Sequence, residues 1–168
     1  AWEALKQKGN CRVLILGGGI NGTGLLRELA HQGIDCVLID KHDFVAGASS
    51  KSSRMIHGGL RYLESYEFSL VFESVSERRV VQDLAPHLVN PLAFLFPVYQ
   101  GARKSLRMIN AGMWLYDGLA LFRSPKRHKT LKPKDVSKEE PLLKQEGLQG
   151  APVSYDCSTD DARLTLET

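Results

Sequence analysis

Two short apolar runs with a helical pattern between them dominate the first forty residues. The runs at 13–16 and 36–39 contain only Val, Leu, Ile and Cys, and they predict strands that are buried on both faces. Apolar residues recur at helical spacing from Leu26 to Ala30, and Gly33 stands where a helix is expected to end. The pattern predicts a strand–helix–strand unit with two parallel strands.

The turn after the first run has the spacing G-x-G-x-x-G, at Gly17, Gly19 and Gly22. Gly17 permits the tight turn, Gly19 lets the backbone approach a pyrophosphate, and Gly22 lets the helix pack closely on the strand. The helix N-terminus favours phosphate groups. Asp40 follows the second strand at the spacing where a carboxylate accepts hydrogen bonds from a ribose. We therefore predict dinucleotide binding; an ordinary glycine-rich turn is the alternative, and it leaves Asp40 unexplained.

The rest of the chain alternates between helical and extended patterns. We expect an α/β fold: a Rossmann-like nucleotide-binding domain with a parallel sheet, and part of an α+β substrate or cap domain. The first domain is predicted to cover residues 1–90 and to be rejoined at 159–168, and the partial domain to cover 91–158. Within these limits we predict helices from Phe68 to Pro86 and at 105–122, strands at 92–96 and 150–157, and a helix from Ser158.

Composition narrows the classes of function. A formal charge of +3, without a basic stripe interleaved with aromatic residues, argues against nucleic-acid binding. The three cysteines are scattered, so neither a metal site nor a disulfide framework is expected. The predicted helix at 105–122 either packs in a core, which we favour, or rests on lipid. The chain lacks an initiator methionine and stops within a pattern at Thr168, so we expect a fragment of a longer protein.

A polar segment follows the nucleotide-binding unit. Serines at 49, 50, 52 and 53 supply short hydroxyl groups suited to a polar ligand close to the backbone. The segment leads directly into His-Gly-Gly-Leu-Arg-Tyr at 57–62, which is not expected of a flexible linker. The two glycines remove side chains where a flat ligand could approach, and His57 and Arg61 flank them. We interpret His57 as a functional rather than a structural histidine.

These motifs resemble the FAD-dependent glycerol-3-phosphate dehydrogenases. The resemblance rests on the glycine turn with Asp40, on the segment 47–64, and on Asp-Asp-Ala-Arg-Leu at 160–164. It extends from about Arg12 to Thr168, and its most specific part is Ile-His-Gly-Gly-Leu-Arg-Tyr-Leu-Glu at 56–64. The chain would be the N-terminal portion of such an enzyme.

The resemblance implies an activity and a set of site residues. The reaction would be oxidation of glycerol 3-phosphate to dihydroxyacetone phosphate with FAD, the electrons passing to a quinone. The enzyme would be cytoplasmic and peripherally associated with the inner membrane. Catalysis is assigned to His57, Arg61 and Tyr62. His57 would transfer a proton or polarise the substrate hydroxyl. Arg61 would stabilise negative charge on the substrate or the reduced flavin, and Tyr62 would be a hydrogen-bonding neighbour. The expected FAD-binding residues are Gly17, Gly19, Ile20, Asn21, Gly22, Asp40, Lys41, Ser49, Ser50, Ser52, Ser53, His57, Gly58 and Gly59.

Several alternatives stay open. An oxidase that passes electrons to oxygen cannot be separated from the quinone enzyme by this sequence. An amine or amino-acid oxidase shares the same strand–helix–strand unit, although the motif at 57–62 argues against it. A plain NAD-binding or non-catalytic fragment is the third alternative. Arg61 is the cation near the motif that could bind a phosphate, so we expect the isolated chain to be inactive.

Overall fold

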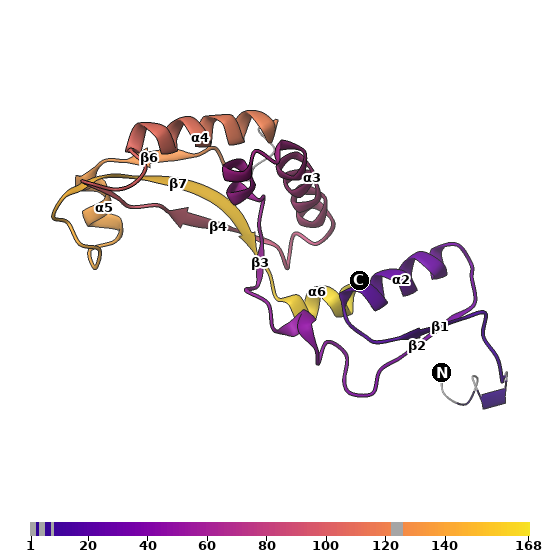
Figure 1. The fold of residues 1–168 in the computed structure, drawn as a ribbon. Coiled ribbons are helices and arrows are strands. Elements are labelled where there is room, and N and C mark those ends of the chain that lie inside the picture. The colour runs from indigo at the N-terminus through magenta and orange to yellow at the C-terminus, as the bar shows by residue number, and fades with distance from the viewer. Residues whose placement is uncertain (1–2, 4–5, 8, 122–125) are drawn as a thin grey trace. The chain divides into compact units, whose positions relative to one another are not determined.

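The computed structural model describes residues 3, 6, 7, 9–121 and 126–168. The chain forms two compact units. The first contains the residues up to Arg54 together with Thr159–Thr168, and the second contains Met55–Ser158 (Figure 1). Both units mix helices with strands, and the first has a parallel sheet, so the predicted α/β fold class is confirmed.

The strand–helix–strand unit forms as predicted. Strand β1 (Val13–Leu16) pairs in parallel with β2 (Cys36–Ile39), and helix α2 (Ile20–His31) connects them. Helix α2 ends in a Schellman turn, in which Ile34 N donates to Leu29 O at 2.9 Å. Gly33 adopts φ +68° in this turn, a conformation that glycine reaches without strain. The short helices η1 (Ala48–Ser50) and α6 (Asp161–Glu167) complete the first unit.

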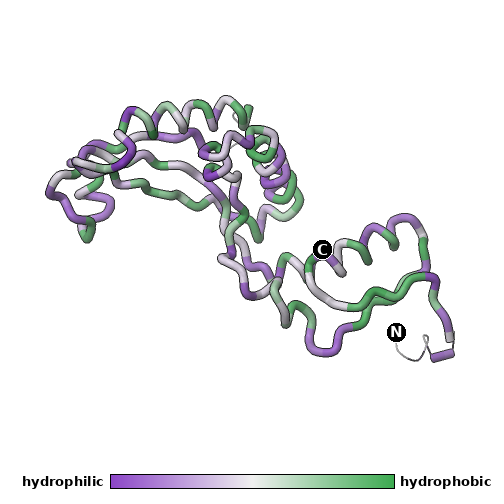
Figure 2. The backbone as a smooth tube through the Cα atoms, viewed as in Figure 1, coloured by the Kyte–Doolittle hydropathy of each residue, from purple (hydrophilic) through white to green (hydrophobic). Residues whose placement is uncertain are grey.

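The two strands are less buried than the sequence predicts. Ile15 is buried, and its side chain lies towards α2 at Gly22. Leu14 and Leu16 alternate with it and are 52% and 76% exposed, although Figure 2 shows both strands as apolar. Among the described residues this sheet has two strands, and α2 covers the face that carries Ile15. Burial on both faces, which we predicted, is therefore wrong for β1 in this chain.

Strand β7 (Leu148–Ser158) is the centre of the second unit. It pairs in antiparallel fashion with its neighbours, whose bounds are β3 (Met55–Ile56), β4 (Asn90–Leu95), β5 (Val98–Tyr99) and β6 (Lys129–Leu131). Figure 1 shows β7 as a long curved strand that runs through this unit. The 11 residues of β7 give it room for several partners along its length.

Helices pack on both faces of β7. A side chain at Gly150 would meet Leu106 of α4 (Leu106–Leu119), while its neighbours Ala151 and Val153 form a core cluster with α5 (Pro133–Glu139). Successive strand residues point to opposite faces, so α4 and α5 lie on opposite sides of β7 (Figure 1). A second cluster joins α4 to η2 (Leu60–Ser65) and α3 (Phe68–Leu84); it consists of Val71, Val75, Tyr116 and Ala120.

The unit boundary differs from the predicted domain boundary near residue 90. Residues 55–90 belong to the second unit, because β3 and β4 both pair with β7 and α3 packs against α4. The chain returns to the first unit at Thr159. Helix α4 begins after Ser105, as predicted, while position 122 lies outside the described residues. No helix in the described part of the chain is long and apolar enough to span a membrane.

Candidate functional site

The glycine turn after β1 is closely packed against its own backbone. Gly17 has φ +121°, and its N–H donates to Ile39 O at 2.8 Å, which ties the turn to the end of β2. A methyl group at Gly22 would overlap Gly17 O, and one at Gly19 would lie 3.0 Å from Ser49 Oγ. Gly17 is thus favoured by its positive φ and Gly22 is required by close packing, as the sequence predicts, whereas the predicted approach of Gly19 to a pyrophosphate remains a prediction.

The carboxylate of Asp40 binds the same turn. Its Oδ2 accepts a hydrogen bond from Gly18 N at 2.7 Å, and its Oδ1 accepts one from His42 N at 2.9 Å. The hydrogen bond from Gly18 and then that from His42 lower the pKa of Asp40. Each carboxylate oxygen of Asp40 has a further lone pair, so Asp40 can still accept a hydrogen bond from a ribose hydroxyl. Lys41 follows and is exposed.

Two of the predicted serines, Ser49 and Ser52, form hydrogen bonds to different parts of the first unit. Ser49 Oγ accepts from Ile20 N at 3.0 Å, at the first residue of α2. Ser50 Oγ donates to Gly47 O at 3.3 Å, and Ser53 is exposed. Ser52 Oγ donates to the carboxylate of Asp161, at the start of α6. The structure thus brings Ser49 to the glycine turn, whereas Ser52 connects two segments that are 109 residues apart in the sequence.

The first unit fits the pyrophosphate of a dinucleotide. The N-cap residue of α2 is Gly19, which has no side chain to cap the first turn of this 12-residue helix. The N–H groups of a first helical turn have no partner within the helix, and with the helix dipole they favour an anion. A methyl group at Gly19 would lie against Ser49 and narrow the approach to these amides. The residues that would hold the phosphates are those from Gly17 to Gly22.

The second predicted motif lies in the other unit. It follows β3 and continues into η2. His57 and Arg61 are exposed, and the ring of His57 meets that of Tyr62 edge-on, with centroids 6.3 Å apart. Tyr62 is half-buried against the cluster formed by α3 and α4. The structure therefore brings the rings of His57 and Tyr62 together, while Arg61 precedes Tyr62 on η2 and is exposed.

Gly58 and Gly59 are required by the protein's own packing. A methyl group at Gly58 would overlap Tyr116 Oη and would lie 2.7 Å from Arg78 Nη1. Gly59 has φ +71°, and a methyl group there would overlap the ring of Tyr62. The sequence interpretation left these positions open for a flat ligand; in the structure, protein atoms occupy the space beside both. Their use in FAD binding remains a prediction.

A buried charged network next to Gly58 escaped the sequence interpretation. Arg78, on α3, is 1% exposed, and its Nη1 forms an ion pair with Asp156 Oδ1. The same nitrogen donates to Tyr155 O at 3.1 Å and to Tyr116 Oη at 3.3 Å. Burial raises the pKa of Tyr116 to about 12. An arginine in the middle of a helical stripe gave no signal, because its partner is 78 residues further along the chain.

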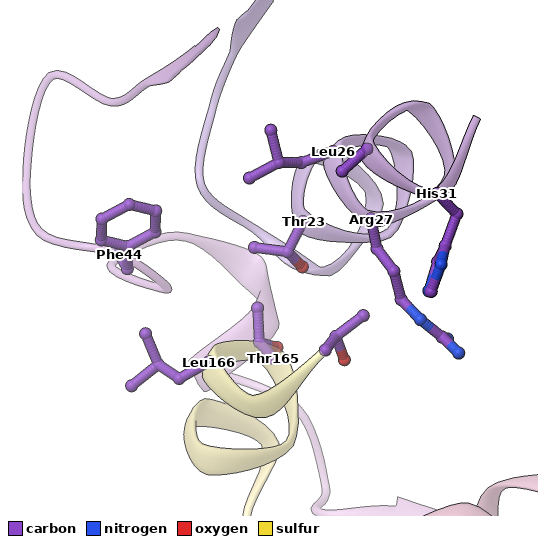
Figure 3. Close-up of a pocket in the computed structure, with 9 residues that line it drawn as sticks. Thr23, Leu26, Arg27, His31, Phe44, Thr165 and Leu166 are labelled. Atoms are coloured by element: carbon purple, nitrogen blue, oxygen red, sulfur yellow. The ribbon is translucent and has the colours of Figure 1, made fainter. Parts of the chain in front are cut away.

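The first unit also contains an open cavity of about 510 Å³ between α2 and α6 (Figure 3). Arg27 and His31 of α2 and Thr165 of α6 are among the residues that line it. None of the predicted site residues is among those that line it. The cavity and the candidate site are therefore different features of this unit.

Comparisons with known proteins agree with the geometry. Residues 12–167 match the model of a family described as FAD dependent oxidoreductase. The chain is 44% identical over 164 residues to an alpha-glycerophosphate oxidase of Streptococcus pyogenes serotype M3, which covers 96% of this chain and 27% of that protein. It is also 44% identical over 156 residues to a glycerol-3-phosphate dehydrogenase of Synechocystis, which covers 92% of this chain and 28% of that protein.

A solved structure supports the same assignment. The glycerol-3-phosphate dehydrogenase from Bacillus halodurans, crystallised with FAD, superposes with a TM-score of 0.64 and 28% identity. The match covers 94% of this chain and 23% of that one. The chain thus spans about a quarter of the length of the proteins that it matches.

Proposed function

Since the chain belongs to the family of FAD dependent oxidoreductases, we propose that the protein containing it oxidises glycerol 3-phosphate to dihydroxyacetone phosphate. The observation that carries this proposal is the identity of 44% over nearly the whole chain to relatives whose names specify glycerophosphate oxidation. FAD is the cofactor of this family, and the predictions of the family and of FAD are confirmed.

The first unit would hold FAD. The amides of Gly17, Gly18 and Ile20 donate to Ile39, Asp40 and Ser49, so the amides of Gly19, Asn21 and Gly22 would bind the pyrophosphate. Asp40 would accept hydrogen bonds from the adenosine ribose. Ser49 fixes the first amide of α2 and so shapes the approach to the phosphates. Bound FAD supplies the two-electron acceptor that protein side chains lack.

The second unit would act on the substrate. His57 is exposed and can take the proton of the substrate hydroxyl while the adjacent carbon is oxidised. Arg61 would stabilise negative charge at the substrate, and Tyr62 stands edge-on to His57 as its neighbour. Further cations for the phosphate group would come from parts of the protein outside this chain.

Spectroscopy of the whole protein tests the proposal. FAD is added, and a shifted, structured visible band shows binding; anaerobic glycerol 3-phosphate should then bleach that band. We expect His57→Asn to slow the bleaching by about 10²- to 10⁴-fold without loss of FAD. The matched control is His87→Asn, an exposed histidine outside the motif, which should bleach like the wild type. A protein that binds NAD in place of FAD, or ignores glycerol 3-phosphate, would refute the proposal.

For the electron acceptor we propose a quinone. A quinone is the acceptor that the resemblance to the dehydrogenases implies; the sequence does not separate it from oxygen, and relatives named oxidase and dehydrogenase are equally similar. The two acceptors give different products, so one assay separates them. With a soluble quinone in air, we expect quinone reduction to outpace hydrogen peroxide formation. The reverse order would assign the oxidase activity instead.

We also propose peripheral attachment to the inner membrane from the cytoplasm. On α4 and just beyond it, Met108, Trp114, Leu115 and Leu121 are exposed, and such residues can rest in a lipid interface. Co-sedimentation of the whole protein with anionic vesicles tests this proposal. Trp114→Gln should weaken binding, whereas Trp114→Phe should retain most of it.

A further inference from the structure

We propose that Arg78, Asp156 and Tyr116 are positioning residues that fix the His57–Gly58–Gly59 turn for catalysis. This inference rests on the proposed function, because it concerns the motif that acts on the substrate. None of the three residues belongs to that motif, and each comes from a different element: α3, β7 and α4.

The key contact is a hydrogen bond to the backbone of the motif. Gly58 N donates to Asp156 Oδ1 at 2.8 Å, and the same oxygen forms the ion pair with Arg78 Nη1. A peptide plane held at its N–H is fixed in rotation, and this plane joins His57 to Gly58. The orientation of Asp156 therefore determines where the His57 side chain leaves the backbone.

Burial makes this arrangement rigid. The side chain of Arg78 is 1% exposed and that of Asp156 is 17% exposed, so neither group can exchange its partner for water without a large cost. Arg78 is held in turn by Tyr155 O and Tyr116 Oη, and Tyr116 is 2% exposed. A charge-assisted hydrogen bond is shorter and stronger than a neutral one, which suits an acceptor that must hold one backbone amide.

Packing closes the turn from the same side. Tyr116 Oη, Arg78 Nη1 and Val75 Cγ2 surround the position where a side chain of Gly58 would begin. Movement of the turn towards the network would therefore cause overlap with these atoms, and movement away from it would break the hydrogen bond from Gly58 N to Asp156 Oδ1. A general base must lie within hydrogen-bond reach of the proton that it abstracts, and small misplacements cost rate steeply.

Hydrogen exchange tests the contact itself, independently of activity. In the whole protein with FAD, the amide of Gly58 is followed in peptides that cover residues 55–60. We expect Asp156→Ala to speed its exchange strongly, because the acceptor is gone. Asp156→Asn retains an acceptor oxygen and should keep most of the protection. Unchanged exchange in Asp156→Ala would overturn the inference.

Kinetics test the consequence for catalysis. The rate constant kcat is divided by the bound flavin, so that unfolded protein does not count. We expect Asp156→Ala to lower kcat per flavin by about a hundredfold, the loss typical of a displaced catalytic group. Asp156→Asn should recover much of this loss. Tyr116→Phe, which removes one partner of Arg78 but keeps the ring, should lower kcat per flavin less than Asp156→Ala.

A matched control separates positioning from stability. Val136 on α5 is fully buried and belongs to the other core cluster, whose buried residues include none from the motif or from the network. Val136→Ala should lower the melting temperature and leave kcat per flavin unchanged. An equal fall in kcat per flavin at an equal loss of melting temperature would show a merely structural role and overturn the inference. A wild-type protein that does not oxidise glycerol 3-phosphate would instead reject the proposed function, and the exchange experiment would still decide whether Asp156 holds the turn.

Discussion

The two units hold their functional segments by different means. In the first, polar side chains near the surface bind backbone amides: Asp40 binds Gly18, and Ser49 binds Ile20. In the second, the turn at Gly58 is held by a buried ion pair and by core side chains. A surface arrangement can hold a turn while neighbouring amides, such as those of Asn21 and Gly22, face a charged cofactor, whereas a buried arrangement fixes a few atoms firmly. The difference suits the proposed roles of the two units, which are binding of FAD by the first and placement of His57 by the second.

The comparison predicts that the largest loss of stability follows from removing the buried charge. Arg78→Leu leaves Asp156 without its partner, and we expect the free energy of unfolding of the second unit to fall by about 3–5 kcal/mol. Hydrogen exchange at increasing urea concentration measures this value for peptides of each unit. The control is Arg79→Leu on the same helix, whose exposed pair with Asp83 should change the value by less than about 1 kcal/mol. Equal effects of the two substitutions would contradict the importance of the buried network.

A smaller loss is expected at the glycine turn of the first unit. Gly22→Ala places a methyl group against Gly17 O, so the helix must shift from the strand, at a cost of about 1–3 kcal/mol. FAD binding should weaken as well, because the first-turn amides move with the helix. Both effects are measured by urea-dependent hydrogen exchange and by titration with FAD.

Gly24 provides the matched control for this substitution. It lies on the same helix, and nothing lies within 4 Å of the position that a methyl group would take. Gly24→Ala should stabilise α2 by about 0.5–1 kcal/mol, since alanine favours the helix. A loss of FAD affinity in Gly24→Ala as large as in Gly22→Ala would show that the turn is not the sensitive point.

The contrast also explains what the sequence could predict. The strand–helix–strand unit and its glycine turn are local, so hydrophobic period and glycine spacing identified them, including the end of the helix at Gly33. The motif at 57–62 was found from its residues alone. The partners of these segments were not, because Asp156 lies 98 residues from Gly58 and Asp161 lies 109 residues from Ser52. The hydrophobic period of the sequence also cannot show which elements cover the face of β1 that carries Leu16, and those elements determine how exposed Leu16 is.

A modest loss of stability is expected at the hydrogen bond between Ser52 and Asp161, which joins the two chain segments of the first unit. Ser52→Ala removes the hydrogen bond to Asp161 and the acceptor for Arg54 N. The contacts are exposed, so we expect the free energy of unfolding of the first unit to fall by about 0.5–1.5 kcal/mol. Faster hydrogen exchange of the amides of α6 would show this loss. Ser53→Ala, at the next position, which is also exposed, should leave that exchange unchanged.

The smallest expected effect concerns the pKa values of two exposed acids, Asp40 and Glu64, which are lowered by different groups. Backbone amides lower the pKa of Asp40, with Gly18 as the main donor, whereas the side chain of Lys104 lowers the pKa of Glu64. Both pKa values are lower in the folded than in the unfolded protein. The stability that each acid contributes is therefore present above its unfolded pKa and is lost as pH falls through the folded value.

Salt should separate these two cases. At about 1 M salt the Debye length is near 3 Å, so the exposed attraction between Lys104 and Glu64 is screened, while fixed amide dipoles in direct contact with Asp40 are screened less. We expect the pKa of Glu64, followed by NMR of its side chain, to rise towards 4.5, and that of Asp40 to stay below 3.8. Lys104→Met should reproduce the effect of salt on Glu64 and leave Asp40 unchanged. If salt raised both pKa values equally, the amides of the glycine turn would not be the groups that hold Asp40 ionised.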